Sequence, residues 1–215
     1  MLSPDTTYPL KGGCTCGAVR YQINTPPLWV NCCHCTWCQR ETGTAFALNL
    51  LIESDRAPLL PPSTSTSTST STSPQPAKTE TETETITIPT PSSSGRGQQI
   101  IRCATCHVAL WSHYGDHGPL VKCVRVGTLD EAWRVGPDAH IFVKEAAGWV
   151  KGGLLELEGG EGGREGAGKG GKVRVVEEFF DLEEVWPVES LERRRVIMPL
   201  VERWRAEREG AGGEG

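Results

Sequence analysis

Gly13-Cys14-Thr15-Cys16-Gly17-Ala18-Val19-Arg20-Tyr21 places two cysteines one residue apart near the beginning of the chain. Glycine residues flank the pair, and glycine permits the sharp turns that bring two such side chains together. Val19, Tyr21 and Ile23 then alternate with polar residues, which is the period of a half-buried strand. The segment predicts two thiols presented side by side at a tight turn that leads into a sheet.

Two more segments carry closely spaced cysteines: Cys33-His34-Cys35-Thr36-Trp37-Cys38 and Cys103-Ala104-Thr105-Cys106. Thiols separated by one or two residues are typical ligands of a divalent metal ion, above all zinc. The outer pairs would form a closed site with four thiolates, made of Cys14, Cys16, Cys103 and Cys106. The middle group would bind a second Zn²⁺ through Cys33, Cys35 and Cys38 and leave one coordination position free.

The two predicted sites suit different roles. Structural zinc contributes on the order of 10 kcal/mol to folding, which is large beside the roughly 5–15 kcal/mol stability of a domain. An open position instead admits water or a thiol, whose pKa the zinc ion lowers.

One alternative is that Cys32 or His34 closes the middle group. In an extended segment, however, both would point away from the ion that Cys33 binds.

Bulk composition narrows the class of protein. A length of 215 residues suits one domain. The net charge of -5 argues against a nucleic-acid-binding protein, and no apolar run approaches the roughly 18 residues of a membrane span. Residues 1–13 do not resemble a secretory signal, so we expect the cytoplasm, with the nucleus accessible. There thiols stay reduced and clustered cysteines bind metal rather than form disulfides.

Low-complexity stretches divide the expected domain, which covers residues 8–208. Residues 54–99 read as a disordered Ser/Thr-rich insert, in which Ile86 and Ile88 favour a brief strand. Residues 152–172 read as a flexible Gly-rich loop, and residues 209–215 as a disordered tail.

The ordered parts predict a mainly β domain of small packed sheets with short C-terminal helices. Strand-like runs are expected at residues 45–52, 120–126, 141–143 and 173–180. Near the C-terminus, Ser190 is expected to cap one short helix and Pro199 to begin a second. The cysteine pair at residues 103–106 follows two isoleucines, as the tip of a hairpin would.

The sequence also suggests environments for a cysteine outside the three groups, for three histidines and for one tryptophan. We expect Cys123 to be a small core side chain, and His113 and His117 to be solvated surface residues. His140 is expected either to pack at the end of a strand or to line a pocket. Trp37, inside the middle cysteine group, is a candidate wall of a substrate cleft.

Together these motifs resemble the family of glutathione-dependent formaldehyde-activating enzymes, which also includes centromere protein V. The resemblance covers nearly all of the ordered chain. It is carried by the segments 13–21, 33–40 with Thr42-Gly43-Thr44, 103–106, 127–130, 140–142 with Trp149, and 186–193. The family usually has glycine after the last cysteine, where this chain has His107. A zinc-binding turn often needs a positive φ there, so His107 is expected either to shift the hairpin tip or to compete as a ligand.

The resemblance implies a zinc-bearing β fold of two packed sheets, related to methionine sulfoxide reductase B. It implies a structural zinc at Cys14, Cys16, Cys103 and Cys106, and a catalytic zinc at Cys33, Cys35 and Cys38. It also implies carbon–sulfur lyase activity on a small-molecule thiol such as glutathione, whose adduct with formaldehyde is S-hydroxymethylglutathione. Arg40 and Arg125 are candidates to bind the carboxylates of such a thiol.

Two other classes of function remain to be weighed. The acidic composition and the Ser/Thr-rich insert favour, as the alternative, a non-catalytic zinc-binding module that interacts with another protein. A nucleic-acid-binding zinc finger fits poorly, because no Cys-Cys-His-His spacing occurs and the net charge has the wrong sign.

Overall fold

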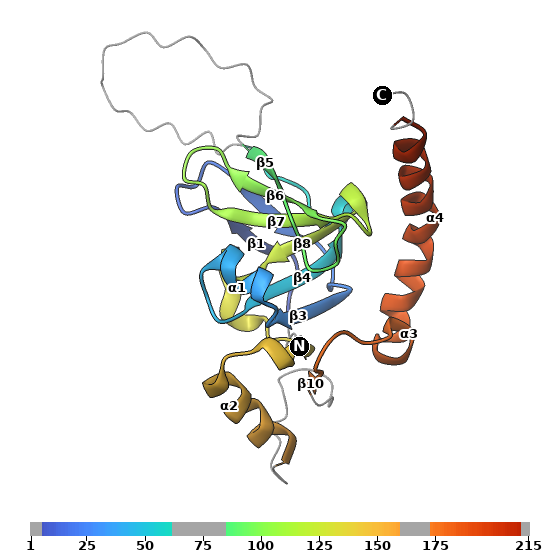
Figure 1. Cartoon of the computed structure of the whole chain (residues 1–215). Helices are drawn as coiled ribbons and strands as arrows, with labels where there is room; N and C mark the ends of the chain where they lie inside the picture. The colour runs from blue at the N-terminus through green and yellow to red at the C-terminus, as the bar shows by residue number, and fades with distance from the viewer. Residues whose placement is uncertain (1–5, 62–84, 160–172, 212–215) are drawn as a thin grey trace, which may run out of the picture.

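The computed structural model describes residues 6–61, 85–159 and 173–211 of the chain, and within them a large and a small β-sheet (Figure 1). The eight-stranded sheet has the order β10-β9-β3-β4-β8-β7-β6-β5. Its strands are β10 (Arg174–Val175), β9 (Ala139–Ile141), β3 (Trp29–Cys33), β4 (Ala47–Glu53), β8 (Val121–Arg125), β7 (Ala109–Tyr114), β6 (Gln98–Cys103) and β5 (Thr85–Thr90). Strands β1 (Leu10–Gly13) and β2 (Arg20–Ile23) form a separate antiparallel pair. Within the large sheet, β9 pairs in parallel with β3 and β10, and the other pairs are antiparallel.

The helices lie around this sheet (Figure 1). They are α1 (Thr36–Thr42), α2 (Gly148–Gly159), α3 (Leu182–Val185) and α4 (Val188–Ala211), with short 3-10 turns at Ser54–Arg56, Gly118–Leu120, Val126–Thr128, Ala132–Arg134 and Val143–Glu145. Figure 1 shows α4 along the right side of the sheet and α2 at the lower left of the molecule. None of the helices in the described ranges has the length and apolar character that crossing a membrane requires.

One face of the large sheet packs against the β1–β2 pair. Side chains alternate across a strand, so every second residue of β4, including Leu50 and Ile52, points to this face. They form a core with Val19, Tyr21 and Ile23 from the small sheet. The small sheet therefore covers one side of the large one, and both the first and the third cysteine pair lie at the edge of this core.

The opposite face packs against the C-terminal segment. Trp29 of β3 stacks on Trp186 just before α4, with ring centroids 6.1 Å apart. Ile197 and Val201 of α4 belong to the same buried cluster. Farther along α4, the Trp204 ring lies so close to Gly118 that a side chain there would collide with it, and Gly118 has a φ of +56°. The 3-10 turn before β8 can therefore lie close to α4 because it has a glycine at the point of contact.

The predicted strands are present, but they join into larger units than expected. The run at residues 45–52 corresponds to β4, the run at 120–126 to β8, and the run at 141–143 to the end of β9. Of residues 173–180, only the two of β10 pair as a strand. The fold is mainly sheet, as predicted. It contains one eight-stranded and one two-stranded sheet, because β8 pairs with β4 and the strands β8, β7, β6 and β5 continue the same hydrogen-bonded sheet.

The expectation of short C-terminal helices is wrong. Helix α4 is one helix of 24 residues that begins at Val188 and runs through Pro199. Proline removes one backbone hydrogen bond, but Pro199 lies on the exposed side, where water can satisfy the free carbonyl. Buried Leu191, Ile197 and Val201 hold both halves of the helix against the sheet, so the helix continues across the proline.

Parts of the stretches that were expected to be disordered or flexible have regular secondary structure. Ser54–Arg56 forms a 3-10 turn, and Thr85–Thr90 forms the edge strand β5 around Ile86 and Ile88. Helix α2 occupies the beginning of the glycine-rich stretch, and α4 extends into the predicted tail. The rest of these stretches, residues 62–84, 160–172 and 212–215, lies outside the described residues.

Candidate functional site

The first and third cysteine pairs meet in space although about 90 residues separate them along the chain. The four sulfur atoms of Cys14, Cys16, Cys103 and Cys106 lie within 4.8 Å of one another. Backbone N–H groups also point at these sulfurs: Val19 donates to Cys14 at 3.3 Å, and Thr105 donates to Cys103 at 3.4 Å. Hydrogen bonds from amides stabilise thiolates. The donor set and its surroundings fit a zinc ion with four thiolate ligands.

The hairpin between β6 and β7 presents the third pair, and His107 completes its turn. The backbone of His107 has a φ of +60°, the left-handed conformation that the turn was expected to need. Its N–H donates to the carbonyl of Cys103 at 3.0 Å, and Cys103 N–H donates to Val108 at 3.0 Å. His107 therefore keeps the tip in place, and its side chain is exposed and outside the four-sulfur group.

The middle cysteine group lies where β3 passes into α1. Cys33 ends the strand, Cys35 caps the helix and Cys38 lies in its first turn, with all three buried and their sulfurs within 4.8 Å. Hydrogen bonds from the Cys33 and Cys38 thiols and the Cys38 backbone N–H lower the pKa of Cys35 to about 2. Hydrogen bonds to Cys35 and Cys38, together with burial, raise the pKa of Cys33. A divalent cation would relieve this competition by stabilising all three as thiolates, so the group fits zinc.

These three thiols open onto a cavity of about 370 Å³. Its wall comes from the sheet, α1, the segment before β6, the turn between β7 and the 3-10 turn Gly118–Leu120, and the segment before α3. The lining residues are Asn31, Cys33, Cys35, Trp37, Cys38, Asn49, Leu51, Ser92, Ser93, Ser94, Gln98, Tyr114, Asp116, His117, Ile141, Phe142 and Phe179. The four-cysteine group does not line it. Among the described residues, the two cysteine groups therefore differ in their surroundings, because the middle group lines this cavity and the four-cysteine group does not.

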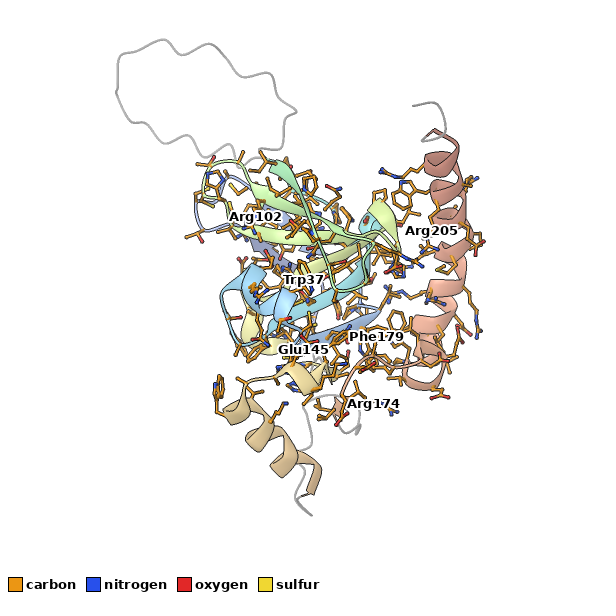
Figure 2. The ribbon with its side chains drawn as sticks, in the orientation of Figure 1. Trp37, Arg102, Glu145, Arg174, Phe179 and Arg205 are labelled. Atoms are coloured by element: carbon orange, nitrogen blue, oxygen red, sulfur yellow. The ribbon has the colours of Figure 1, made fainter. Side chains whose placement is uncertain are left out.

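Aromatic side chains form much of this wall, including Trp37, as predicted, and Phe179 (Figure 2). Trp37 remains 45% exposed at the rim. His117 also lines the cavity and is largely buried, which lowers its pKa, so its expected place on the solvated surface is wrong. His113 is partly buried as well, and its Nδ1 lies 2.8 Å from the carbonyl oxygen of Val121. Cys123 is a buried side chain of β8, as predicted.

A third group of metal-ligand side chains lies on the other face of β3. Cys32, His34 and His140 have their ligand atoms within 4.8 Å of one another. His34 Nε2 lies 2.9 Å from His140 Nδ1, while the ring centroids are 5.2 Å apart and the rings only 19° from parallel. The two rings are therefore nearly parallel, and a hydrogen bond joins their facing nitrogen atoms. Burial and the neighbouring His34 lower the pKa of His140 to about 4.

The positions of Cys32, His34 and His140 test two expectations drawn from the sequence. The alternative in which Cys32 or His34 closes the middle group finds no support, because the alternation of β3 places both with His140, away from Cys33. His140 is not part of the cavity wall; it pairs with His34 beside the strand end.

The two arginines proposed for substrate carboxylates do not line the cavity either. Arg125 is 7% exposed and is held by Glu41 of α1 at 2.7 Å, by Asn49 and by Ser112. Glu41 also binds Arg102 at 2.7 Å. Sequence reasoning missed this network and the two asparagines of the cavity floor. The available signal was the alternation itself, since Asn31 and Asn49 occupy inward positions among apolar neighbours.

The model of the protein family described as glutathione-dependent formaldehyde-activating enzyme matches residues 9–145 of the chain. No curated protein sequence matches the chain significantly. Among solved structures, a crystal structure of a Rhodobacter sphaeroides protein is 17% identical, with a TM-score of 0.37, and the match covers 60% of this chain and 92% of that one.

Proposed function

Because this chain belongs to the family of glutathione-dependent formaldehyde-activating enzymes, we propose that it is a zinc-dependent carbon–sulfur lyase that makes and breaks the adduct of a small thiol with formaldehyde. The observation that carries the proposal is the opening of Cys33, Cys35 and Cys38 onto a cavity of about 370 Å³. A purely structural metal site has no need of such a space.

The proposal assigns different roles to the two cysteine groups. Cys14, Cys16, Cys103 and Cys106 would hold a structural zinc that joins the small sheet to the β6–β7 hairpin. Cys33, Cys35 and Cys38 would hold a second zinc, which supplies Lewis acidity that favours the thiolate form of a substrate thiol. We propose the cytoplasm as its compartment, because cysteines that bind zinc have to stay reduced.

The net reaction is R–SH + CH₂=O ⇌ R–S–CH₂–OH. In the forward direction the thiolate sulfur attacks the carbonyl carbon and the C–S bond forms. The π electrons of the C=O bond move to oxygen, which then receives a proton from water, so the proton lost by the thiol is balanced. In reverse, the hydroxyl loses its proton, the C=O bond forms and the C–S electron pair returns to sulfur.

The residues of the cavity can orient such a substrate. Trp37, Phe142 and Phe179 form apolar walls near the thiols, and a low local polarity strengthens electrostatic interactions there. Ser93, which contacts Cys35, and Ser94 and Gln98 supply neutral polar groups in the cavity, suited to the peptide groups of a thiol such as glutathione. Glutathione is therefore the proposed thiol.

The test is an exchange assay on purified protein with its metal content measured. The proposal expects two zinc ions per chain and accelerated exchange between formaldehyde, glutathione and their adduct in NMR exchange spectra. A chain with two zinc ions and no acceleration with any thiol would instead favour the non-catalytic zinc-binding module, and then its acidic surface would be the place to seek a protein partner.

A further inference from the structure

Two asparagine side chains lie next to the three thiols on the floor of the cavity. Asn31 of β3 and Asn49 of β4 are direct partners in the antiparallel register, so they stand side by side on the same face. Asn31 precedes Cys33 by two residues on that face, a distance of roughly 7 Å along a strand. The two asparagines are only 7% and 4% exposed, and both line the cavity. Polar groups this deeply buried require partners.

Each asparagine already has its oxygen engaged by a group that can only donate. The indole Nε1 of Trp29 donates to Asn31 Oδ1 at 3.0 Å. The guanidinium of Arg125 donates to Asn49 Oδ1. Neither indole nor guanidinium can accept a hydrogen bond, so each contact determines which end of the amide is the oxygen. Both NH₂ groups are thereby left as donors, and within the described ranges no residue accepts a hydrogen bond from either.

The network behind Asn49 ties this donor to the helix of the thiols. Arg125 is held in turn by Glu41 at 2.7 Å and by Ser112 at 3.2 Å. Glu41 belongs to α1, the same short helix that carries Cys38. The position of the amide and the position of the thiol group are therefore set by one rigid, buried set of contacts.

We propose that Asn31 and Asn49 are catalytic residues that bind the oxygen of the one-carbon unit. This inference rests on the proposed function. When the C–S bond forms, the carbonyl oxygen of formaldehyde gains negative charge, and when it breaks, the deprotonated hydroxyl oxygen carries that charge. Two fixed N–H donors on the wall of the cavity stabilise such an oxygen in the transition state. A pair with only a structural role would have had both ends of each amide bonded within the protein.

Isosteric substitutions test the assignment. Asn31→Asp and Asn49→Asp keep an oxygen for Trp29 and Arg125 but remove the NH₂ donor. Each should lower kcat for the formaldehyde–glutathione reaction by about 100- to 1000-fold, with little change in the KM for glutathione. Asn31→Leu, which has nearly the same size, adds no charge and carries no donor, should lower kcat similarly. Asn24→Asp is the matched control, because Asn24 is exposed and outside the cavity, and it should retain the wild-type rate.

A binding measurement on the wild-type protein tests the same claim without relying on any variant. In NMR titrations with excess formaldehyde, the hydroxymethyl adduct of glutathione should bind at least about tenfold more tightly than S-methylglutathione, which lacks the oxygen. Equal affinity, or aspartate and leucine variants with wild-type kcat in an active enzyme, would overturn the asparagine assignment alone. A zinc-loaded wild-type protein with no turnover would overturn the proposed function as well, so the two failures are distinguishable.

Discussion

The two cysteine groups share chemistry but differ in their surroundings, and the difference is informative. The four-cysteine group joins two chain segments at the edge of the fold, with Cys16 exposed and Cys106 half-buried. The three-cysteine group comes from one continuous segment, is buried throughout, and faces a cavity. A site assembled from distant segments suits a cross-link, since it restricts the unfolded chain. A site preassembled on one strand and helix needs no such role and can leave a ligand position for substrate.

The largest effect is expected from breaking the cross-link. Cys103→Ser should remove the structural zinc and with it on the order of 10 kcal/mol, enough to prevent cooperative folding. Far-UV circular dichroism during thermal unfolding, together with zinc analysis, measures this. Cys123→Ser is the control, because Cys123 is a buried cysteine outside every cysteine group. If both variants unfold alike, the cross-link is not structural.

Removing a thiol from the other group should act on chemistry instead. Cys38→Ser is expected to abolish detectable turnover of the formaldehyde–glutathione adduct while the protein remains folded with one zinc ion per chain. The same thermal scan and metal analysis provide the comparison with Cys103→Ser. An equal loss of folding in both variants would contradict the division of roles.

The buried charge network around α1 should give an intermediate effect on stability. The side chain of Glu41 is 8% exposed and pairs with that of Arg125, which is 9% exposed. Glu41→Gln leaves that arginine charge buried without its counter-ion and should cost about 3 kcal/mol in urea unfolding. Glu131→Gln breaks an exposed pair with Arg134 and should cost less than about 1 kcal/mol. Similar costs for the two would show that the network does not support the helix of the thiols.

Acid should weaken the region behind the three-cysteine group. His140 has a folded pKa of about 4, below its usual 6.5, so below pH 6.5 the unfolded chain takes up a proton that the folded chain does not. The stability contribution is complete above pH 6.5 and is lost as the pH falls towards 4. The urea midpoint should therefore fall more between pH 7 and pH 5 for the wild type than for His140→Asn. Equal drops would argue against a neutral His34–His140 pair.

The smallest effect is expected at the hairpin tip of the four-cysteine group. His107 holds a positive φ that glycine adopts without strain. His107→Gly should leave zinc content unchanged and raise stability by no more than about 1 kcal/mol, since glycine also loses more entropy on folding. Thermal scans measure the shift. A marked loss of stability would show that the imidazole itself contributes to the site.

Much of this architecture was accessible from local pattern. The alternation around Val19 and Tyr21 predicted β2, and the isoleucines before Cys103 predicted the β6–β7 hairpin. Errors arose where distant contacts override local signals. Pro199 usually ends a helix, but packing against the sheet carries α4 through it. His117 looked solvated because its loop is polar, yet α4 packs against that loop and buries the residue.

The sequence by itself determined the number and spacing of the thiol groups, because ligands one or two residues apart are neighbours whatever the rest of the chain does. Tertiary structure alone decided what faces them. Asn49 stands beside Asn31 only because β4 pairs with β3 in one register, and a slip of one residue would turn it to the opposite face. Arg125 reaches Asn49 only because β8 pairs with β4 across more than 70 residues of chain. Such contacts depend on the relative placement of distant strands, which no local pattern encodes.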